Sequence, residues 1–224
     1  MELRKNDFIE IDFTARIKDT GEVFDSNIAS ELEKINPNYN KDQAKPFIFP
    51  LGNEMFLKGV EEFLIGKPDK TGEHKIELTS DKAFGKRDPK LMSKIPTKIF
   101  MEHKINPIPG VMFNFDGRIA KILAVSGGRV IADFNNPIAG KDVIYDIKLI
   151  KKIDDINEKV KNLTKFLFRK EMDFEIKDKT IILSVEKQIK PFVEMFKEKF
   201  KEILGFDLET KEIGKEVKPE ETNK

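Results

Sequence analysis

Residues 46 to 60 combine many apolar side chains with a glycine that precedes a predicted short helix. The segment reads Pro46-Phe47-Ile48-Phe49-Pro50-Leu51-Gly52-Asn53-Glu54-Met55-Phe56-Leu57-Lys58-Gly59-Val60. A chain that turns at Gly52 and then enters a helix gathers such side chains around a shallow apolar pocket. Upstream, Asp25 follows Phe24, and a carboxylate beside an apolar cluster costs free energy unless its surroundings serve a purpose. These residues indicate apolar binding with one acidic group nearby.

Composition excludes several other kinds of chemistry. The chain has 224 residues and no Cys, which excludes thiolate nucleophiles, disulfides and sulfur-based zinc sites. His74 and His103 are the only histidines and lie far apart, so we expect no metal site and no cofactor. The 41 Lys and Arg residues nearly balance 40 Asp and Glu residues, so neither nucleic acid nor a membrane is an expected partner.

The amino terminus leads directly into a strand-like segment without an apolar run of the kind that forms a signal peptide or membrane span. We therefore expect a soluble cytoplasmic protein. Abundant Lys and Glu without Cys are also typical of heat-adapted proteins.

Strict alternation predicts the strands that would position the pocket. Apolar and polar residues alternate from residue 9 to 17, which turns Phe13 inward, and the same pattern over residues 141 to 151 turns Tyr145 inward. A further strand is expected at 74 to 78. Residues 26 to 45 are polar, which predicts a loop with one helical turn.

A short helix is expected after the strand that holds Phe47 and Phe49. Asn53 is its predicted cap, and one face would carry Phe56, Val60, Phe63 and Leu64. Antiparallel strands wrapped on one helix make an α+β half-barrel.

The remaining segments form their own modules. Residues 86 to 138 are too long for a hairpin loop and contain a predicted hairpin across Gly127-Gly128, which indicates an inserted, mainly-β domain. After residue 153 we expect a helix at 156 to 166, a strand pair at 174 to 185 and an amphipathic helix at 192 to 204. The predicted division is 1–85 plus 139–152, then 86–138, then a C-terminal α+β module at 153–224, with a frayed end at 215–224.

Several ordered motifs resemble the FKBP-type peptidyl-prolyl cis-trans isomerases. They are Gly21-Glu22-Val23-Phe24-Asp25-Ser26, Pro46 to Phe49 with Leu51-Gly52, Gly59-Val60-Glu61-Glu62, and Ala83-Phe84-Gly85. Ile95-Pro96-Thr97-Lys98-Ile99-Phe100 and Asn136-Pro137-Ile138-Ala139-Gly140-Lys141 are similar to the insert-in-flap (IF) pattern of SlyD-like members. The resemblance implies a half-barrel isomerase with an inserted chaperone domain.

The resemblance also implies which residues form the proline site. Catalytic roles would fall to Asp25, Phe24, Phe47, Leu57, Phe84 and Tyr145, with Phe13, Phe56 and Val60 binding substrate. Leu57 would offer its backbone N–H to a substrate carbonyl, and Asp25 would polarise the surroundings of the rotating carbonyl. Two alternatives are that the aromatics only fill the half-barrel core, and that Asp25 serves an ordinary turn or cap.

Three residues depart from the best-known family pattern. Val60 stands where many members have Trp, while Phe13 and Phe84 stand where many have Tyr. A lost Tyr hydroxyl removes a hydrogen bond worth about 1 kcal/mol net. We therefore expect an altered pocket with weak macrolide binding.

The insert is rich in Met and Phe, and Met suits surfaces that adapt to varied partners. By resemblance, Ile95, Phe100, Met101, Met112 and Phe113 would bind unfolded or nascent polypeptides that contain proline. The alternative is that they fill a small core.

Two further choices stay open on the sequence. The apolar stripe at 192 to 204 indicates either local core or a homodimer interface. A holdase chaperone without useful isomerase activity is the competing function.

Overall fold

The computed structural model describes residues 1–213 of the chain. Two compact units are present: one comprises Met1–Phe13, Asn40–His74 and the chain from Ile147 onward, the other Thr14–Tyr39 and Lys75–Asp146. The predicted fraying of residues 215–224 lies outside the described residues. Within residues 1–213, no helix is both long enough and apolar enough to cross a membrane.

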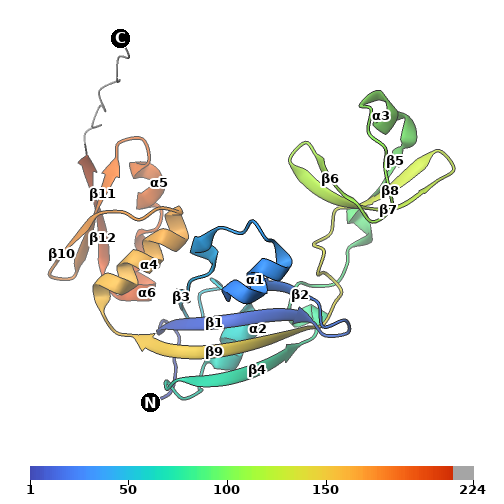
Figure 1. Ribbon diagram of the computed structural model, residues 1–224. Helices are drawn as coiled ribbons and strands as arrows, with labels where there is room; N and C mark the ends of the chain where they lie inside the picture. Colours follow the sequence, from blue (N-terminus) through green and yellow to red (C-terminus); the bar gives the residue numbers. More distant parts are fainter. Residues whose placement is uncertain (214–224) are drawn as a thin grey trace, which may run out of the picture. The chain divides into compact units, whose positions relative to one another are not determined.

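The main sheet has five strands in the order β2-β1-β9-β4, and β3 also pairs with β1 (Figure 1). Their bounds are β1 Phe8–Ile17, β2 Val23–Ser26, β3 Phe47–Pro50, β4 Gly72–Leu78 and β9 Val143–Ile153. The short segments around them are α1 Ala29–Ile35, η1 Lys41–Gln43, α2 Lys58–Leu64 and η2 Ser80–Lys82. The predicted α+β class is confirmed.

The alternation of β1 and β9 has the expected structural result. The apolar residues of β1 are all buried, and Phe13 is 6% exposed. In β9, Tyr145 is 3% exposed. Thr14 is an exception, because it is a buried polar residue in β1, and its hydroxyl lies 3.2 Å from the hydroxyl of Ser26 on β2. That hydrogen bond satisfies both hydroxyls inside the sheet.

Two predictions about the segments beside these strands are wrong. Residues 26 to 45 hold the two-turn helix α1 as well as η1, and the pattern missed α1 because Leu32 is its only buried residue. Asn53 does not cap the next helix. Helix α2 begins at Lys58 with Leu57 as its N-cap residue, so Phe56 lies before the helix and not on its face.

The insert forms a four-stranded antiparallel sheet in the order β5-β8-β7-β6. Its elements are η3 Pro89–Leu91, β5 Met92–Pro96, α3 Thr97–Glu102, β6 Met112–Phe115, β7 Arg118–Ser126 and β8 Arg129–Asp133. The predicted hairpin is confirmed: Ser126 pairs with Arg129, and the two glycines between them have φ of 57° and 74°. Such left-handed turns match the twist of the strands they join.

The C-terminal module combines a mixed sheet with helices. Its described elements are α4 Ile156–Phe168, β10 Phe174–Lys177, β11 Thr180–Glu186, α5 Lys190–Glu194, α6 Lys197–Leu204 and β12 Asp207–Ile213. Strand β11 pairs antiparallel with β10 and parallel with β12. Asp155 caps α4 by accepting a hydrogen bond from the Glu158 N–H at 2.8 Å.

The single helix predicted at 192 to 204 is wrong, since the structure has the two short helices α5 and α6. Phe200 and Ile203 lie in the core, at 0% and 5% exposed. Phe192 and Met195 are 50% and 79% exposed, so only part of the apolar stripe is covered.

Candidate functional site

Four phenylalanines of the first compact unit pack together and are called the Phe47 cluster: Phe13, Phe47, Phe49 and Phe56. The ring centroids of Phe13 and Phe56 lie 4.9 Å apart, edge to face, and those of Phe47 and Phe56 lie 5.8 Å apart. Phe49 stacks on Phe47 at 5.1 Å. Phe47 and Phe56 stay half-buried, whereas Phe49 is 1% exposed. The cluster therefore has a core side and an accessible side.

The turn between β3 and α2 is held by one buried carboxylate. Glu61 is 2% exposed, and it accepts hydrogen bonds from the backbone N–H groups of Asn53 at 3.0 Å, Glu54 at 3.2 Å and Phe56 at 2.7 Å. Charge-assisted bonds of this kind are stronger than neutral ones. Glu61 thus fixes the backbone that presents Phe56 and Leu57. Nothing in the sequence distinguishes Glu61 from its neighbour Glu62, and only the family motif pointed to this position.

Leu57 is half-buried and ends this turn. Its carbonyl accepts from the N–H groups of Val60 at 2.8 Å and Glu61 at 3.1 Å, which starts helix α2. Within residues 1–213, its own N–H has no hydrogen-bond acceptor. That donor lies next to the half-buried Phe56, whereas Val60 on the helix is fully buried at 0% exposed.

A second aromatic group belongs to the other compact unit. This Phe24 cluster consists of Phe24, Phe84 and Tyr145, with centroid distances from Phe24 of 5.6 Å to Phe84 and 6.2 Å to Tyr145. Both pairs are edge to face. Phe24 and Phe84 are half-buried and Tyr145 is buried.

The electrostatics of Asp25 and Tyr145 are linked. Burial raises the pKa of the Asp25 carboxyl above its ordinary value, and a hydrogen bond from the Ser26 backbone partly offsets this rise. Burial also raises the pKa of the Tyr145 hydroxyl, and the charge of Asp25 adds to that rise. Asp25 keeps contact with solvent even so, since its residue is exposed. It is a carboxylate at the edge of an apolar group.

The loop that carries Phe84 is tied to its surroundings by backbone hydrogen bonds. Gly85 has a φ of 74°, its N–H donates to the Ser80 carbonyl at 2.8 Å, and its carbonyl accepts from Gly140 at 2.7 Å. The Ser80 N–H donates to the Asp142 carboxylate at 2.8 Å. Phe84 is therefore presented from a fixed turn.

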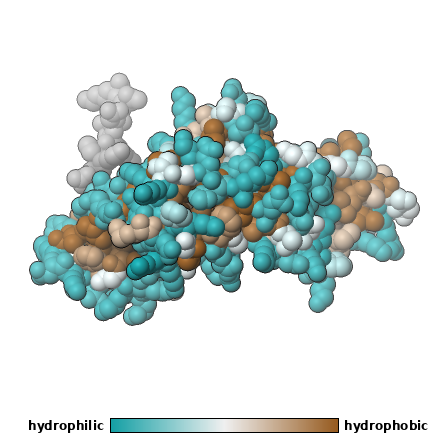
Figure 2. Space-filling model, turned by 90° about the horizontal axis from the view of Figure 1, so that it is seen from below, coloured by the Kyte–Doolittle hydropathy of each residue, from teal (hydrophilic) through white to brown (hydrophobic). Residues whose placement is uncertain are grey.

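The predicted client-binding residues of the insert divide into two groups. Phe100 is 2% exposed and lies in the core with Ala120, Ile122, Val130 and Ala132, and Ile95 and Phe113 pack against that core. Met101 and Met112 are 69% and 45% exposed. Phe100 therefore serves the core rather than the surface. Figure 2 shows hydrophobic residues gathered on the insert, at the right of the view.

Two clefts border the insert surface. One, of about 380 Å³, is lined by Thr97, Met101, Lys104, Ile105, Asn106, Pro107 and Val125. The other, of about 270 Å³, includes both Phe24 and Met112, together with the ion pair of Arg87 and Asp133. The lining of the second cleft contains both apolar and charged side chains.

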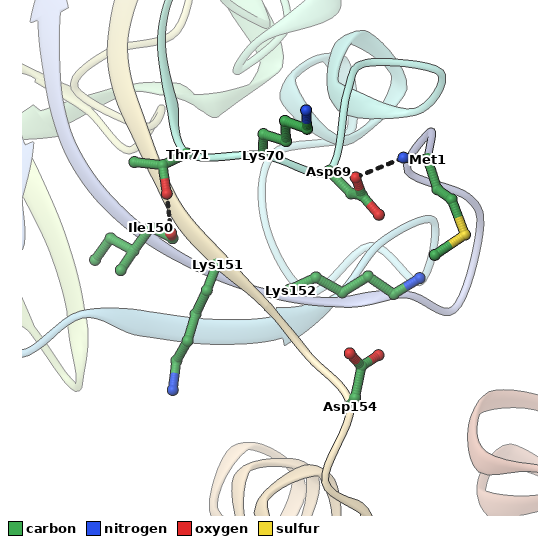
Figure 3. A pocket seen from close by; sticks show the side chains of 8 residues that line it. All are labelled: Met1, Asp69, Lys70, Thr71, Ile150, Lys151, Lys152 and Asp154. Atoms are coloured by element: carbon green, nitrogen blue, oxygen red, sulfur yellow. Dashed lines mark hydrogen bonds and ion pairs between the residues drawn. The ribbon is translucent and has the colours of Figure 1, made fainter.

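A third cleft, of about 450 Å³, has none of the residues of the two aromatic clusters in its lining, which is mostly polar (Figure 3). The amino group of Met1 pairs with Asp69 at 2.9 Å, the Thr71 hydroxyl donates to the Ile150 carbonyl at 2.7 Å, and Lys152 pairs with Asp7 at 2.7 Å. This polar lining does not suit a proline ring. Among the described residues, no group of three or more His, Cys, Asp or Glu could hold a metal ion.

The main sheet with helix α2, the two aromatic clusters and the inserted β-sheet are the arrangement expected of an FKBP-type isomerase with an inserted domain. Residues 94–138 match the family model described as "FKBP26, IF domain". The chain is 30% identical over 148 residues to the short-type peptidyl-prolyl cis-trans isomerase of Methanocaldococcus jannaschii. The aligned residues cover 66% of this chain and 92% of that relative.

A second relative is the FKBP-type 16 kDa peptidyl-prolyl cis-trans isomerase of Escherichia coli. It is 31% identical over 117 residues, which are 50% of this chain and 76% of the relative. The chain belongs to the FKBP-type peptidyl-prolyl cis-trans isomerase family, and its insert is of the FKBP26 type.

Proposed function

We propose that this protein catalyses cis-trans isomerisation of Xaa-Pro bonds in unfolded or partly folded polypeptides. The observation that carries the proposal is the accessible Phe47 cluster beside the Leu57 N–H, which has no acceptor among the described residues, in a chain that belongs to this family. The family assignment also supports a proline-binding role for the Phe24 cluster and Asp25.

The reaction needs no nucleophile. Resonance gives the imide bond partial double-bond character and a barrier of about 20 kcal/mol. Twisting the bond breaks that resonance and reduces charge separation. An apolar environment therefore disfavours the planar ground state more than the twisted one, and each ~1.4 kcal/mol of difference is tenfold in rate.

Binding of the proline and stabilisation of the twisted imide are assigned to different residues. The rings of Phe47 and Phe56 provide apolar contact for the proline, and the Leu57 N–H donates to the substrate carbonyl. In the other cluster, Phe24 and Tyr145 provide apolar surface, and Asp25, at the edge of that cluster, polarises the surroundings of the rotating carbonyl.

A cis/trans exchange assay on a short proline peptide tests the proposal. Phe47→Ala and Asp25→Ala should each lower kcat/KM by about tenfold or more, equivalent to at least ~1.4 kcal/mol. The matched control is Phe192→Ala, the same truncation at a half-exposed ring on α5. No acceleration by the wild-type protein would favour the competing function, a holdase chaperone on the same scaffold.

We also propose that the insert captures client chains and improves isomerisation in whole proteins. Its exposed Met101 and Met112, and the cleft beside Met101, support this role. Met101→Ser with Ile105→Ser should slow catalysed refolding of a proline-limited protein while leaving short-peptide turnover intact. Lys98→Ser, at a side chain 84% exposed on the same helix as Met101, is the control. Equal loss in both assays would contradict separate roles for the insert and the isomerase site.

The predicted homodimer stays a proposal that rests on the uncovered part of α5. Phe192→Ser with Met195→Ser should reduce the mass measured by light scattering if this face joins two chains. An unchanged mass would remove α5 as the interface. The division into residues 1–85 plus 139–152, 86–138 and 153–224 likewise stays a prediction, and limited proteolysis would test its boundaries.

A further inference from the structure

The C-terminal module contacts the amino-terminal segment that supports the turn before α2. The carbonyl oxygen of Glu202 on α6 accepts a hydrogen bond from the Asn6 side-chain amide at 2.8 Å. Asn6 has a φ of 70°, a left-handed conformation that Asn tolerates better than most residues. Its backbone N–H donates to the Leu51 carbonyl at 2.9 Å, so Asn6 is fixed against the turn.

The contact continues from Asn6 into the turn itself. The side-chain oxygen of Asn6 accepts from the Asn53 side-chain amide at 3.0 Å, and that same amide donates to the Leu51 carbonyl at 3.0 Å. The backbone N–H of Asn53 donates to Glu61, whose carboxylate also accepts from Phe56. A continuous set of hydrogen bonds therefore joins α6 to the residues that present Phe56 and Leu57.

A second contact reaches the aromatic wall directly. The ring of Phe166, on α4, lies 6.4 Å from the ring of Phe47, and both rings are half-buried. The Arg169 guanidinium lies 5.7 Å from the Phe166 ring. In Figure 1, α4 lies beside β3, the strand that begins with Phe47. Phe47 thus has an aromatic neighbour from the C-terminal module.

Neither contact belongs to the core of the C-terminal module. That core contains Val160, Leu163, Phe200 and Ile203, all buried. Phe168, two residues after Phe166, turns to Phe192 and Phe196 at 6.1 Å and 5.2 Å. Phe166 and the Glu202 carbonyl are instead directed at the segments that carry the candidate site.

We propose that the C-terminal module is a positioning element of the isomerase site, acting through Asn6 on the turn before α2 and through Phe166 on Phe47. The inference rests on the proposed function for the role of that turn. Asn6 and Phe166 are positioning residues, since each acts through another group. Loss of this positioning should lower the affinity for substrate. The Leu57 N–H and the Phe47 ring bind the planar and the twisted substrate alike, so their displacement raises KM more than it lowers kcat.

Asn6→Asp tests the first contact in the full-length protein. Aspartate keeps an oxygen to accept from Asn53 and tolerates the backbone conformation, but it places a second oxygen against the Glu202 carbonyl. We expect KM for a short proline peptide to rise about fivefold with kcat nearly unchanged. Hydrogen exchange at the backbone amides of Asn53, Glu54 and Phe56 should accelerate in parallel. Asn36→Asp is the control, because Asn36 is exposed and its side chain accepts from the Asn38 N–H at 3.0 Å.

Phe166→Ala tests the second contact, and we expect about a threefold rise in KM. Phe166→Leu should restore most of the affinity, because it keeps an apolar neighbour for Phe47. Phe168→Ala removes the adjacent ring on the same helix and should leave KM unchanged. Partial unfolding would instead lower the active fraction, and so kcat, without changing KM.

The outcomes separate this inference from the proposed function. If wild-type protein is active, and Asn6→Asp and Phe166→Ala leave KM and amide exchange unchanged, the inference is overturned. If wild-type protein gives no acceleration, the proposed function fails and amide exchange alone decides the inference. Faster exchange in Asn6→Asp then supports positioning by the module, and unchanged exchange refutes it.

Discussion

Replacing Glu61 by Gln should loosen the turn that presents Phe56 and Leu57. The carboxylate of Glu61 accepts three backbone hydrogen bonds, two at one oxygen and one at the other. A Gln side chain has the same shape but only one acceptor oxygen. If that oxygen keeps the bonds from Asn53 and Glu54, the new NH₂ group opposes the N–H of Phe56.

The size of the effect follows from the number and type of bonds. Losing one bond to a charged acceptor costs about 2 kcal/mol, and turning two others into bonds with a neutral acceptor costs about 0.5 kcal/mol each. The sum is about 3 kcal/mol. Because Glu61 is 2% exposed, water cannot replace the lost partner.

Native-state hydrogen exchange of the Asn53, Glu54 and Phe56 amides measures this change locally, and about 3 kcal/mol corresponds to roughly 100-fold faster exchange. The proline-peptide assay should show a parallel fall in kcat/KM of about tenfold. Glu62→Gln is the matched control, because the Glu62 side chain is 63% exposed. Its ion pair with Lys58 is long, at 4.0 Å. Wild-type exchange and activity in Glu61→Gln would refute the bracing role.

Three other perturbations have defined outcomes. Burial raises the Asp25 pKa above its ordinary 3.8, so the folded state binds that proton more tightly and ionisation of Asp25 destabilises the fold as pH rises through this range. Asp25→Asn should thus have a thermal midpoint at pH 7 equal to or above that of wild type, with lower isomerase activity, and the midpoints should converge at low pH; a lower midpoint at pH 7 would contradict this. Gly52→Ala should cost about 2 kcal/mol in urea unfolding, because φ is 75° and the new Cβ would lie 2.8 Å from Cγ of Lys5. Gly21→Ala, at φ 70° with nothing within 4 Å, should cost only about 1 kcal/mol, and equal costs would argue against the Lys5 contact. Because Val60 stands where many family members have Trp, we expect weak rapamycin binding, which calorimetry would measure. An affinity equal to that of Trp-containing family members would overturn that expectation.

Period-2 alternation was enough to predict β1 and β9, because each strand buries one face and pairs on both edges. The hairpin at Gly127-Gly128 was equally predictable, since its two glycines meet a strict backbone requirement. Helix α1 was missed because a helix with one buried residue has no apolar period. The break between α5 and α6 was missed because apolar residues continue through it, although Met195 faces solvent.

The candidate site was predictable in its apolar residues and not in its polar supports. Aromatic side chains near a turn are visible in the sequence, and the structure brings Phe47 and Phe56 together within the first unit. Glu61 and Asn6 are ordinary polar residues until the fold buries one and gives the other a positive φ. Most of their partners are backbone groups, whose positions cannot be read from residue types.

The hydrogen bond between Asn6 and Glu202 spans 196 positions of the chain. At a synthesis rate of about 10 residues per second, roughly 20 s separate the appearance of its two ends on the ribosome. Until α6 has emerged, the support for the turn before α2 is incomplete, although every residue of the two aromatic clusters already exists. A nascent copy of this protein therefore holds its full set of site residues well before it holds their final geometry.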